Sequence, residues 1–380
     1  MKYSRYIILL LTLVILFTPL ALVGRHHVIE SENRELAPLP QIKKDAQLNS
    51  AFFKELNAWY NDHFGLRSWF LGLHTTLQRN LRRPDYPVVL VGKGKWLFYK
   101  GDKSIPKYQG LDLLTPQQLE TISDNLRTFN QELKRQGTHF VLFITADKNS
   151  IYGDFYPNYI KKIADKNRTD QILEHLKTSA PEVHIIDTRP LLMAKRQTSD
   201  RSLYYTNDTH WNDLGAFYGT QYLLQSIAPF LKTSPELNLS DYQISVKTGY
   251  EGDLARLSGD PARHTYGLSV ELDPHSPYQY SPILRCIGVH TKEHATQHAD
   301  TTLPKAYVVR DSFMASMAQY LSNSFSAVEY RHINNGAITQ EELEGVQSDV
   351  FIYQTVERSL PTRGLNHLKI SPTTPAQGNP

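Results

Sequence analysis

The chain has almost no cysteine: Cys286 is the single one among its 380 residues. One cysteine cannot form a disulfide within the chain or supply a thiolate cluster for a structural metal site. Charge of one sign is lacking too, since 41 Lys and Arg residues stand against 38 Asp and Glu residues, a formal net charge of +3. This balance argues against a dedicated nucleic-acid-binding protein.

Low-complexity sequence is also missing outside the two ends. Hydrophobic residues make up 40% of the chain and charged residues 21%, as in an ordinary globular protein. Residues 28–50 hold Pro38 and Pro40 among mixed charges and are predicted to be a linker. Residues 371–380 carry three prolines and are predicted to be disordered. One large domain is therefore expected over residues 51–370.

The N-terminus resembles an export signal. Lys2 and Arg5 precede an apolar run at 6–23, and Arg25 follows it. Basic residues before such a run favour a cytoplasmic N-terminus, and the run is just long enough to span a bilayer. Its end lacks a good small-x-small cleavage site. We expect residues 1–27 to be an uncleaved signal anchor, with a cleaved signal peptide as the alternative; in either case the remainder is exported.

Helix and strand patterns alternate through most of the chain. A helical pattern at 51–83 precedes two short apolar segments at 88–91 and 96–99. Strands are predicted at 139–145, 183–187, 305–310 and 349–354, and helices at 115–136, 170–178, 213–229 and 312–322. This alternation predicts an α/β domain with a mainly parallel sheet. Residues 230–300, rich in Pro, Gly, His and Asp, are predicted to be a loop-rich insertion.

Ser312 lies where an active α/β domain would place a nucleophile. The segment YVVRDSF at 307–313 ends an apolar strand, and a helix is predicted to start at or just after the serine. Ligands of such sheets bind at the carboxyl ends of strands. The N–H groups of the helix start could stabilise an oxyanion. A serine hydroxyl is a weak nucleophile alone, so a base must also activate it. The alternative is that Ser312 only caps the helix.

The segment NDTHWND at 207–213 could supply that base. Asp208 could orient His210, and His210 could take the serine proton, as in a Ser-His-Asp triad. Trp211 would pack the loop or stack on a sugar. Two alternatives stay open: a capped helix start with an exposed histidine, and a metal site, because Asp-x-His also suits a divalent ion.

Polar groups after two more strands are candidates for substrate or oxyanion contacts. Lys148, Asn149 and Tyr152 follow the 139–145 strand, and Gln354 and Arg358 follow the 349–354 strand. Arg310, directly before the Asp-Ser pair, is a further candidate. The alternative for Lys148 is a solvated turn, and Glu357 with Arg358 is expected to be a structural ion pair.

Seven ordered stretches resemble the SGNH-hydrolase-like family of alginate O-acetyltransferases, the AlgX and AlgJ type. They are ENRELAPLP at 32–40, FFKELNAWYNDHFGLR at 52–67, GKWLFYKGD at 94–102, DTHWNDLGAF at 208–217, GDLA at 252–255, RDSF at 310–313 and VER at 356–358. The most specific pair is D-x-H-W followed about a hundred residues later by a strand that ends in D-S-F. The usual GDSL block is absent, and Arg310 stands where a glycine would precede the Asp-Ser pair.

The resemblance implies an SGNH-like α/β/α sandwich with Ser312 as nucleophile, His210 as general base and Asp208 as the residue that orients His210. It also implies a chain order in which the serine follows the Asp-His pair, a bacterial envelope location on the extracytoplasmic face of the inner membrane, and a membrane O-acyltransferase partner that supplies acetyl groups. No cofactor and no metal are expected.

The expected function is O-acetylation of an exopolysaccharide or cell-envelope glycan through an acetyl-enzyme. With water as acceptor the same triad would make an acetylesterase. Two further hypotheses stay open: a non-catalytic glycan-binding scaffold of an export complex, and a metal-dependent hydrolase that uses Asp208 and His210.

Overall fold

A computed structural model describes residues 28–29, 34–44, 47–63, 73, 86–233, 235–260, 267–286, 292–360 and 365–368. The predicted signal anchor at 1–27 and the predicted disordered tail at 371–380 lie outside these residues. Within the described part, no helix has both the length and the apolar character needed to span a bilayer.

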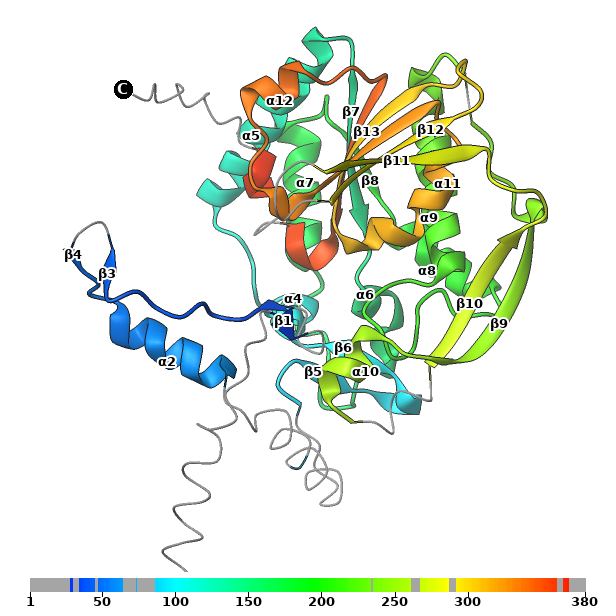
Figure 1. Ribbon diagram of the computed structural model, residues 1–380. Coiled ribbons are helices and arrows are strands. Elements are labelled where there is room, and N and C mark those ends of the chain that lie inside the picture. Colours follow the sequence, from blue (N-terminus) through cyan, green and yellow to red (C-terminus); the bar gives the residue numbers. More distant parts are fainter. Residues whose placement is uncertain are drawn as a thin grey trace, which may run out of the picture.

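A seven-stranded sheet forms the centre of the domain (Figure 1). Its spatial order is β11-β12-β14-β13-β15-β7-β8. The strands are β7 (His139–Thr145), β8 (His184–Asp187), β11 (Tyr280–Cys286), β12 (Lys292–His298), β13 (Lys305–Arg310), β14 (Ala327–His332) and β15 (Val350–Val356). The last strand in sequence, β15, lies between β13 and β7 in the middle of the sheet.

The sheet is mixed, so the prediction of a mainly parallel sheet needs correction. Strands β14, β13, β15, β7 and β8 pair in parallel. Strand β12 pairs antiparallel with β14, and β11 pairs antiparallel with β12. Both added strands come from residues 230–300, which we predicted to be a loop-rich insertion with only short strands. Their sequences, YSPILRC and KEHATQH, lack the continuous apolar run of a strand buried on both faces, because they form one edge of the sheet.

Helices cover both faces of the sheet, which gives an α/β/α sandwich. On one face lie α5 (Pro116–Arg135), α7 (Arg168–Ser179) and α12 (Gln340–Glu344), and on the other lie α8 (Arg189–Thr198), α9 (Asp213–Ile227) and α11 (Ala318–Ser322). The position of β7 between the two helix layers explains why its sequence is apolar throughout. Leu142 faces the first layer and Phe143 the second, and neither is exposed.

Most predicted elements lie within a few residues of their observed bounds. The best case is α5, which begins after Thr115 with a complete capping box: the Thr115 hydroxyl accepts from Gln118 N–H, and the Gln118 side chain accepts from Thr115 N–H. The single helix predicted at 312–322 is wrong, since a 3₁₀ turn at Ser312–Ser316 precedes the short α11. Strand β14 and helix α8 were not predicted.

The region at 230–300 is richer in strands than we predicted. Besides β11 and β12 it contains α10 (Asp253–Ser258) and the antiparallel pair β9 (Tyr242–Tyr250) and β10 (Gly267–Pro274). Tyr242 of β9 packs edge-on against Phe217 of α9, with 5.4 Å between ring centroids. This pair of strands has an exposed face, which is why polar residues interrupt its apolar pattern.

The first part of the described chain lies beside the sheet rather than in it. Helix α2 (Phe52–His63) covers the start of the predicted helix at 51–83, and the residues between it and Tyr86, apart from Leu73, are outside the described part. The expected linker at 28–50 contains two short antiparallel pairs, β1 with β2 (Val28–Ile29, Arg34–Glu35) and β3 with β4 (Lys43–Lys44, Gln47–Leu48).

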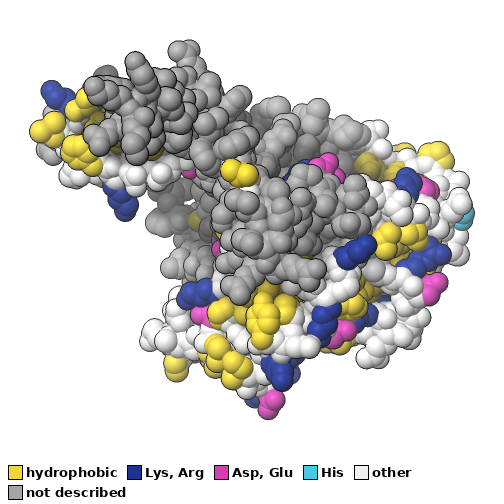
Figure 2. All heavy atoms as spheres, turned by 90° about the horizontal axis from the view of Figure 1, so that it is seen from below, with side chains coloured by type: hydrophobic (Ala, Val, Ile, Leu, Met, Phe, Trp, Pro, Cys, Tyr) yellow, Lys and Arg dark blue, Asp and Glu magenta, His cyan; other side chains and the backbone are white. Residues whose placement is uncertain are grey.

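Further short elements stand next to the sheet. Strands β5 (Val89–Val91) and β6 (Leu97–Tyr99) form an antiparallel pair, followed by α4 (Ser104–Gln109), while α6 (Lys148–Tyr152) follows β7. Strand β6, α6 and α10 lie together below the carboxyl end of the parallel strands in Figure 1. On the face drawn in Figure 2, basic side chains are interspersed with acidic and apolar ones among the described residues.

Two histidines meet at the amino end of the sheet and should make stability depend on pH. Nε2 of His139 lies 3.0 Å from Nδ1 of His184, and Phe230 stacks on His139. Burial and then the neighbouring histidine lower the pKa of His139 to about 4. Between pH about 6.5 and 4 the unfolded chain therefore binds protons that the folded pair does not bind. The free energy of unfolding consequently falls as the pH falls through this range.

We predict that His139→Gln reduces the loss of unfolding free energy between pH 7 and pH 4.5 by about 1 kcal/mol, an amount that allows for the partial exposure of the imidazole. Urea unfolding at both pH values measures it. The exposed His275 provides the control, and His275→Gln should keep the wild-type difference. An unchanged difference in His139→Gln would contradict the prediction.

Candidate active site

His210 lies in a tight loop that leads into α9. The loop is closed by two backbone bonds, from Tyr205 N–H to His210 O at 3.3 Å and from Asn212 N–H to Leu203 O at 3.0 Å. The Asn212 side chain then caps α9 by accepting from Gly215 N–H at 3.1 Å. The helix cap that was predicted as an alternative is therefore present, and Asn212 forms it. The same loop also holds His210 in a defined position.

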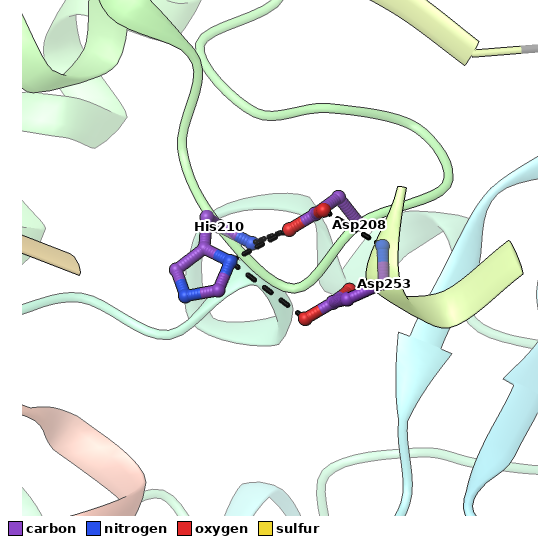
Figure 3. Close-up of side chains that lie close together, drawn as sticks. All are labelled: Asp208, His210 and Asp253. Atoms are coloured by element: carbon purple, nitrogen blue, oxygen red, sulfur yellow. Dashed lines mark hydrogen bonds and ion pairs between the residues drawn. The ribbon is translucent and has the colours of Figure 1, made fainter. Parts of the chain in front are cut away.

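The loop brings His210 against Ser312. Nε2 of His210 lies 2.8 Å from Oγ of Ser312, and Nδ1 lies 2.7 Å from Oδ1 of Asp208. His210 N–H also donates to Oδ1 of Asp208 at 2.9 Å, which fixes the loop around the pair. Figure 3 shows Asp208 beside Nδ1. A hydroxyl on one imidazole nitrogen and a carboxylate on the other is the arrangement that a Ser-His-Asp triad requires.

Each partner shifts the titration of the other. Burial alone would raise the pKa of Asp208, but the hydrogen bond and charge of His210 hold it well below its usual range. Burial alone would lower the pKa of His210, yet the Asp208 hydrogen bond and charge outweigh it, so the pKa of His210 is raised. The pair therefore favours a carboxylate beside an imidazole that readily accepts a proton.

Ser312 follows β13 and is exposed, whereas the residue before it is anchored in the protein. Asp311 accepts from Phe313 N–H at 2.9 Å, from Gln354 Nε2 at 2.8 Å and from Val356 N–H at 2.6 Å. Gln354 Oε1 in turn accepts from Asp311 N–H at 3.0 Å. These bonds join the serine turn to the carboxyl end of β15, so its backbone has little freedom.

This network corrects one prediction and narrows another. Gln354 is buried, and its amide bonds to Asp311 and to Thr145, so it orients the serine turn and does not face a substrate. The N–H of Phe313 already donates to Asp311. That N–H is therefore not free for an oxyanion, and the role predicted for the start of the helix stays a prediction for its other N–H groups.

Trp211 connects the His210 loop to the Ser312 turn. Its Nε1–H donates to Phe313 O at 2.9 Å, and its ring packs edge-on against the Phe313 ring. Trp211 has no exposed surface. The prediction that Trp211 stacks on a sugar is therefore wrong, whereas its predicted packing role is confirmed.

Lys148 is buried beneath the histidine loop. Its ammonium donates to the carbonyl oxygens of Leu97 at 2.7 Å, Thr206 at 3.0 Å and Asp208 at 2.9 Å. Three acceptors match the three N–H groups of a protonated amine. Burial lowers the pKa of Lys148 to about 7, while the charges of Asp208 and Asp253 act in the opposite direction. Lys148 is neither a solvated turn residue nor a free substrate ligand, because it holds the loop.

Two neighbours of Lys148 differ in what they can reach. Tyr152 is buried, stacks on Trp96 at 4.4 Å and accepts from Leu203 N–H at 2.9 Å, so it supports the loop and does not face a substrate. Asn149 donates one N–H to the Tyr156 hydroxyl at 3.1 Å. Asn149 also lines a small pocket with Tyr99, Thr209 and Arg358, next to His210.

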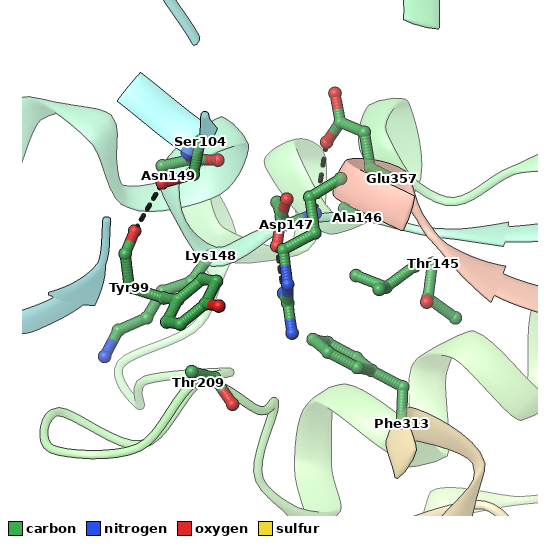
Figure 4. A network of polar contacts seen from close by, with 12 residues as sticks. Tyr99, Ser104, Thr145, Ala146, Asp147, Lys148, Asn149, Thr209, Phe313 and Glu357 are labelled. Carbon is green, nitrogen blue, oxygen red and sulfur yellow. Dashed lines mark hydrogen bonds and ion pairs between the residues drawn. The ribbon is translucent and has the colours of Figure 1, made fainter. Parts of the chain in front are cut away.

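Arg358 and Glu357 do not pair with each other as predicted. Arg358 forms an ion pair with Asp147, and its guanidinium lies 5.4 Å from the ring centroids of both Tyr99 and Phe313. Glu357 pairs with Arg189 at 3.4 Å. Figure 4 shows Asp147, Glu357, Thr209 and Phe313 around this region. Arg358 thus lies at the pocket wall beside the serine turn.

Arg310 ends β13 opposite His332 on β14 and is partly buried. Burial lowers the pKa of its guanidinium, although the charge of Asp311 opposes this. Among the described residues, none forms a hydrogen bond or ion pair with it. Of the predicted substrate contacts, Arg310, Asn149 and Arg358 therefore remain compatible with the structure.

One acidic residue beside His210 was not predicted from the sequence. Oδ2 of Asp253 lies 3.7 Å from Nδ1 of His210, as Figure 3 shows, and Asp253 N–H donates to Oδ2 of Asp208 at 2.8 Å. Asp208, His210 and Asp253 together offer three potential metal-ligand atoms within 4.8 Å of one another. The stretch GDLA contains Asp253, but nothing in the neighbouring residues pointed to a chemical role for it.

Comparison with known proteins identifies the family of this chain. The sequence model of the family described as "SGNH hydrolase-like domain, acetyltransferase AlgX" matches residues 89–336, which include Asp208, His210 and Ser312. The chain belongs to this family. The resemblance predicted from the seven short stretches is thereby confirmed, and so is an SGNH-like α/β fold.

One curated relative of this AlgX family is the probable alginate O-acetylase AlgJ of Pseudomonas aeruginosa. It is 28% identical over 170 residues, which cover 44% of this chain and 40% of the relative. The match thus spans less than half of either protein, and the activity of the whole relative does not pass to this chain by similarity alone.

Two solved structures share the fold. Bacillus cereus PatB1 has a TM-score of 0.57 and 15% identity, over 75% of this chain and 99% of that one. A DHHW family protein from Eubacterium siraeum has a TM-score of 0.52 and 14% identity, over 68% of this chain and 92% of that one. At such identities the likeness concerns the fold of the AlgX family and not its chemistry.

The three hydrogen bonds of the Lys148 ammonium yield a testable prediction. Lys148→Met keeps the apolar stem but leaves three buried carbonyl groups without a donor, so we expect the free energy of unfolding to fall by about 3 kcal/mol. Chemical denaturation measures this. The control is Lys134→Met on the exposed side of α5, where a change of at most about 0.5 kcal/mol is expected. Equal effects in the two variants would contradict the role of Lys148.

Proposed function

We propose that this chain is a serine-dependent O-acetyltransferase that acetylates a polysaccharide through an acetyl-enzyme on Ser312. The observation that carries the proposal is the continuous contact from Ser312 Oγ through His210 to Asp208, at 2.8 and 2.7 Å. Membership of a family described as acetyltransferase supports the reaction type. The probable alginate O-acetylase activity of the AlgJ relative supports a polysaccharide acceptor.

The first half-reaction loads the enzyme. Oγ of Ser312 forms a bond to the carbonyl carbon of an acetyl donor while its proton moves to Nε2 of His210. The carbonyl oxygen carries the negative charge of the tetrahedral intermediate until the bond to the leaving oxygen breaks. His210 gives its proton to that oxygen, and the acetyl group remains on Ser312. Asp208 keeps the imidazole in the tautomer that presents Nε2 as a base.

The second half-reaction uses the same groups. A sugar hydroxyl loses its proton to Nε2 of His210 and attacks the acetyl carbonyl, and the proton then returns to Ser312 as its ester bond breaks. Asn149 and Arg358, at the pocket next to His210, are the groups we propose for the acyl oxygen, and Arg310 for the acceptor. With water as acceptor the same steps give an acetylesterase, so the acceptor decides between the two activities.

The proposal also concerns location and partner. The apolar run after Lys2 and Arg5 supports attachment to the inner membrane of a bacterial envelope, with the SGNH-like domain on the extracytoplasmic side. The resemblance to the AlgX and AlgJ type implies a partner of this kind, so we propose a membrane O-acyltransferase that delivers acetyl groups across that membrane.

We predict that Ser312→Ala and His210→Ala each lower turnover of a chromogenic acetyl ester by about 10⁴-fold, because a serine without its base, or a base without its serine, cannot form the acetyl-enzyme. The full-length wild type should carry an acetyl group on the peptide that contains Ser312, as detected by mass spectrometry after a rapid acid quench. A saccharide acceptor should then receive the acetyl group.

Ser316 in the same 3₁₀ turn provides the matched control, and Ser316→Ala should retain activity. Wild-type turnover in Ser312→Ala would exclude the serine mechanism and favour a glycan-binding scaffold. Loss of wild-type activity with a chelator, restored by a divalent ion, would instead favour a metal-dependent hydrolase that uses Asp208, His210 and Asp253.

A further inference from the structure

Asp253 is a second carboxylate at the imidazole that the proposed acyl-transfer mechanism does not yet use. It is the first residue of α10 and comes from a part of the chain far from the His210 loop in sequence. Its Oδ1 accepts from Thr209 N–H at 2.7 Å, and its Oδ2 accepts from the Thr209 hydroxyl at 2.5 Å. The same Oδ2 lies 3.7 Å from Nδ1 of His210.

The start of α10 packs closely against the His210 loop. Asp253 N–H donates to Asp208 Oδ2 at 2.8 Å, and Ala255 N–H donates to Asn207 O at 3.0 Å. A Cβ on Gly252 would lie 2.3 Å from Asn207 O, so only glycine allows this approach. The Gly-Asp pair therefore delivers a carboxylate to a defined position beside Nδ1 of His210.

The position is electrostatically expensive for a carboxylate. Burial first, and then the charge of Asp208, raises the pKa of Asp253. The hydrogen bond from Thr209 N–H does not by itself require a charge, because the carbonyl oxygen of an asparagine would accept it equally well. The Thr209 hydroxyl, which donates to Oδ2, would have to turn and accept from the asparagine NH2 group instead. What an asparagine could not supply is negative charge next to the imidazole.

Charges of both signs surround this carboxylate. The titratable groups that face Asp253 and His210 are Asp208 on the same loop, Lys148 of α6, Tyr250 at the end of β9, Arg358 after β15 and Ser312 after β13. Lys148 and Arg358 are cations held by other segments, and both favour the ionised form of Asp253. Asp208 opposes it, and Tyr250, with its hydroxyl 3.5 Å from Asp208 Oδ2, is neutral because burial raises its pKa.

We propose that Asp253 is a positioning residue of the acyl-transfer centre, which fixes Thr209 beside His210 and supplies a second negative charge to the imidazolium that forms when Ser312 gives up its proton. The inference rests on the proposed function and deepens it. Asp253 takes no proton in the cycle: the proton moves from Ser312 Oγ to His210 Nε2 and on to the leaving oxygen. A fixed anion near Nδ1 stabilises the charged imidazole more than the neutral one, and therefore the transition state more than the ground state.

Asp253→Asn tests this in the full-length protein. The variant keeps an acceptor for Thr209 N–H and removes the charge. We expect kcat for the acetyl ester to fall at least about tenfold, with little change in KM, because the missing charge acts on the imidazolium and not on substrate binding. The acid limb of the pH profile of kcat/KM reports the proton on free His210. Without the second anion that limb should move to lower pH by about one pH unit.

Two further variants separate charge from structure. Asp253→Glu retains the charge, so its acid limb should stay closer to that of wild type than the limb of Asp253→Asn. Asp260, also buried and bonded to the Tyr86 hydroxyl at 3.0 Å, is the structural control. Asp260→Asn should lower the unfolding midpoint without moving the acid limb.

An Asp253→Asn variant with the wild-type acid limb and kcat would overturn the inference, since Asp253 would then be neutral or without effect on His210. That result differs from failure of the proposed function. If Ser312→Ala remained active, the serine mechanism itself would fall. If Ser312→Ala were inactive while Asp253→Asn behaved as wild type, only the role of Asp253 would fall. An Asp253→Asn loss of kcat with an unmoved limb, matched by Asp253→Glu, would also reject the charge effect.

Discussion

The buried ammonium of Lys148 is the interaction on which the candidate site depends. A charge without solvent needs a full set of hydrogen-bonding partners, and here each of the three N–H groups has a backbone carbonyl. Two of those carbonyls belong to the segment that carries Asp208 and His210, and the third belongs to β6. The loop is closed by hydrogen bonds of its own, and the lysine that follows another strand fixes its position relative to β6.

The same principle holds on the other sides of the loop. Trp211 connects it to the serine turn through one hydrogen bond and an edge-on ring contact. The start of α10 holds it through two backbone N–H groups, which donate to the Asp208 carboxylate and to Asn207 O. Asp311 and Gln354 do for Ser312 what these groups do for His210, because they join the serine turn to the neighbouring strand. His210 and Ser312, which lie on two turns outside the strands, are in this way held by the sheet.

The sequence was sufficient for the elements whose pattern is local. Strand β7 is a continuous apolar run, and α5 has both an amphipathic face and a capping box, so each could be predicted from neighbouring residues. Asp208, His210 and Ser312 could be named because all three occupy short polar segments next to predicted helix starts, one of them at a strand end, and because the family resemblance assigned them roles.

What sequence could not give is which polar residues face inward. Three side chains at strand or helix ends are buried although their neighbours in sequence suggest a surface position: Trp211, Lys148 and Gln354. Each is bonded to a segment far away in the chain, which the local sequence does not reveal. Trp211 bonds to Phe313, 102 residues later. Asp253 was missed for the same reason, since its partners are on a loop more than 40 residues earlier. The edge strand β11 and its neighbour β12 were missed because polar residues interrupt the apolar pattern in both.

The place of β15 has a consequence for when the candidate site can form. This strand is the last of the sheet in sequence, but it lies between β13 and β7, and its register pairs Val350 with His139. Parallel pairing over so many residues forms slowly, because a long loop must close before any contact repays the entropy. Until residues 350–356 have been synthesised and inserted, the Ser312 turn lacks its anchor in Gln354 and Val356. The contact between Ser312 and His210 can therefore become fixed in a growing chain only after residues 350–356 have been made.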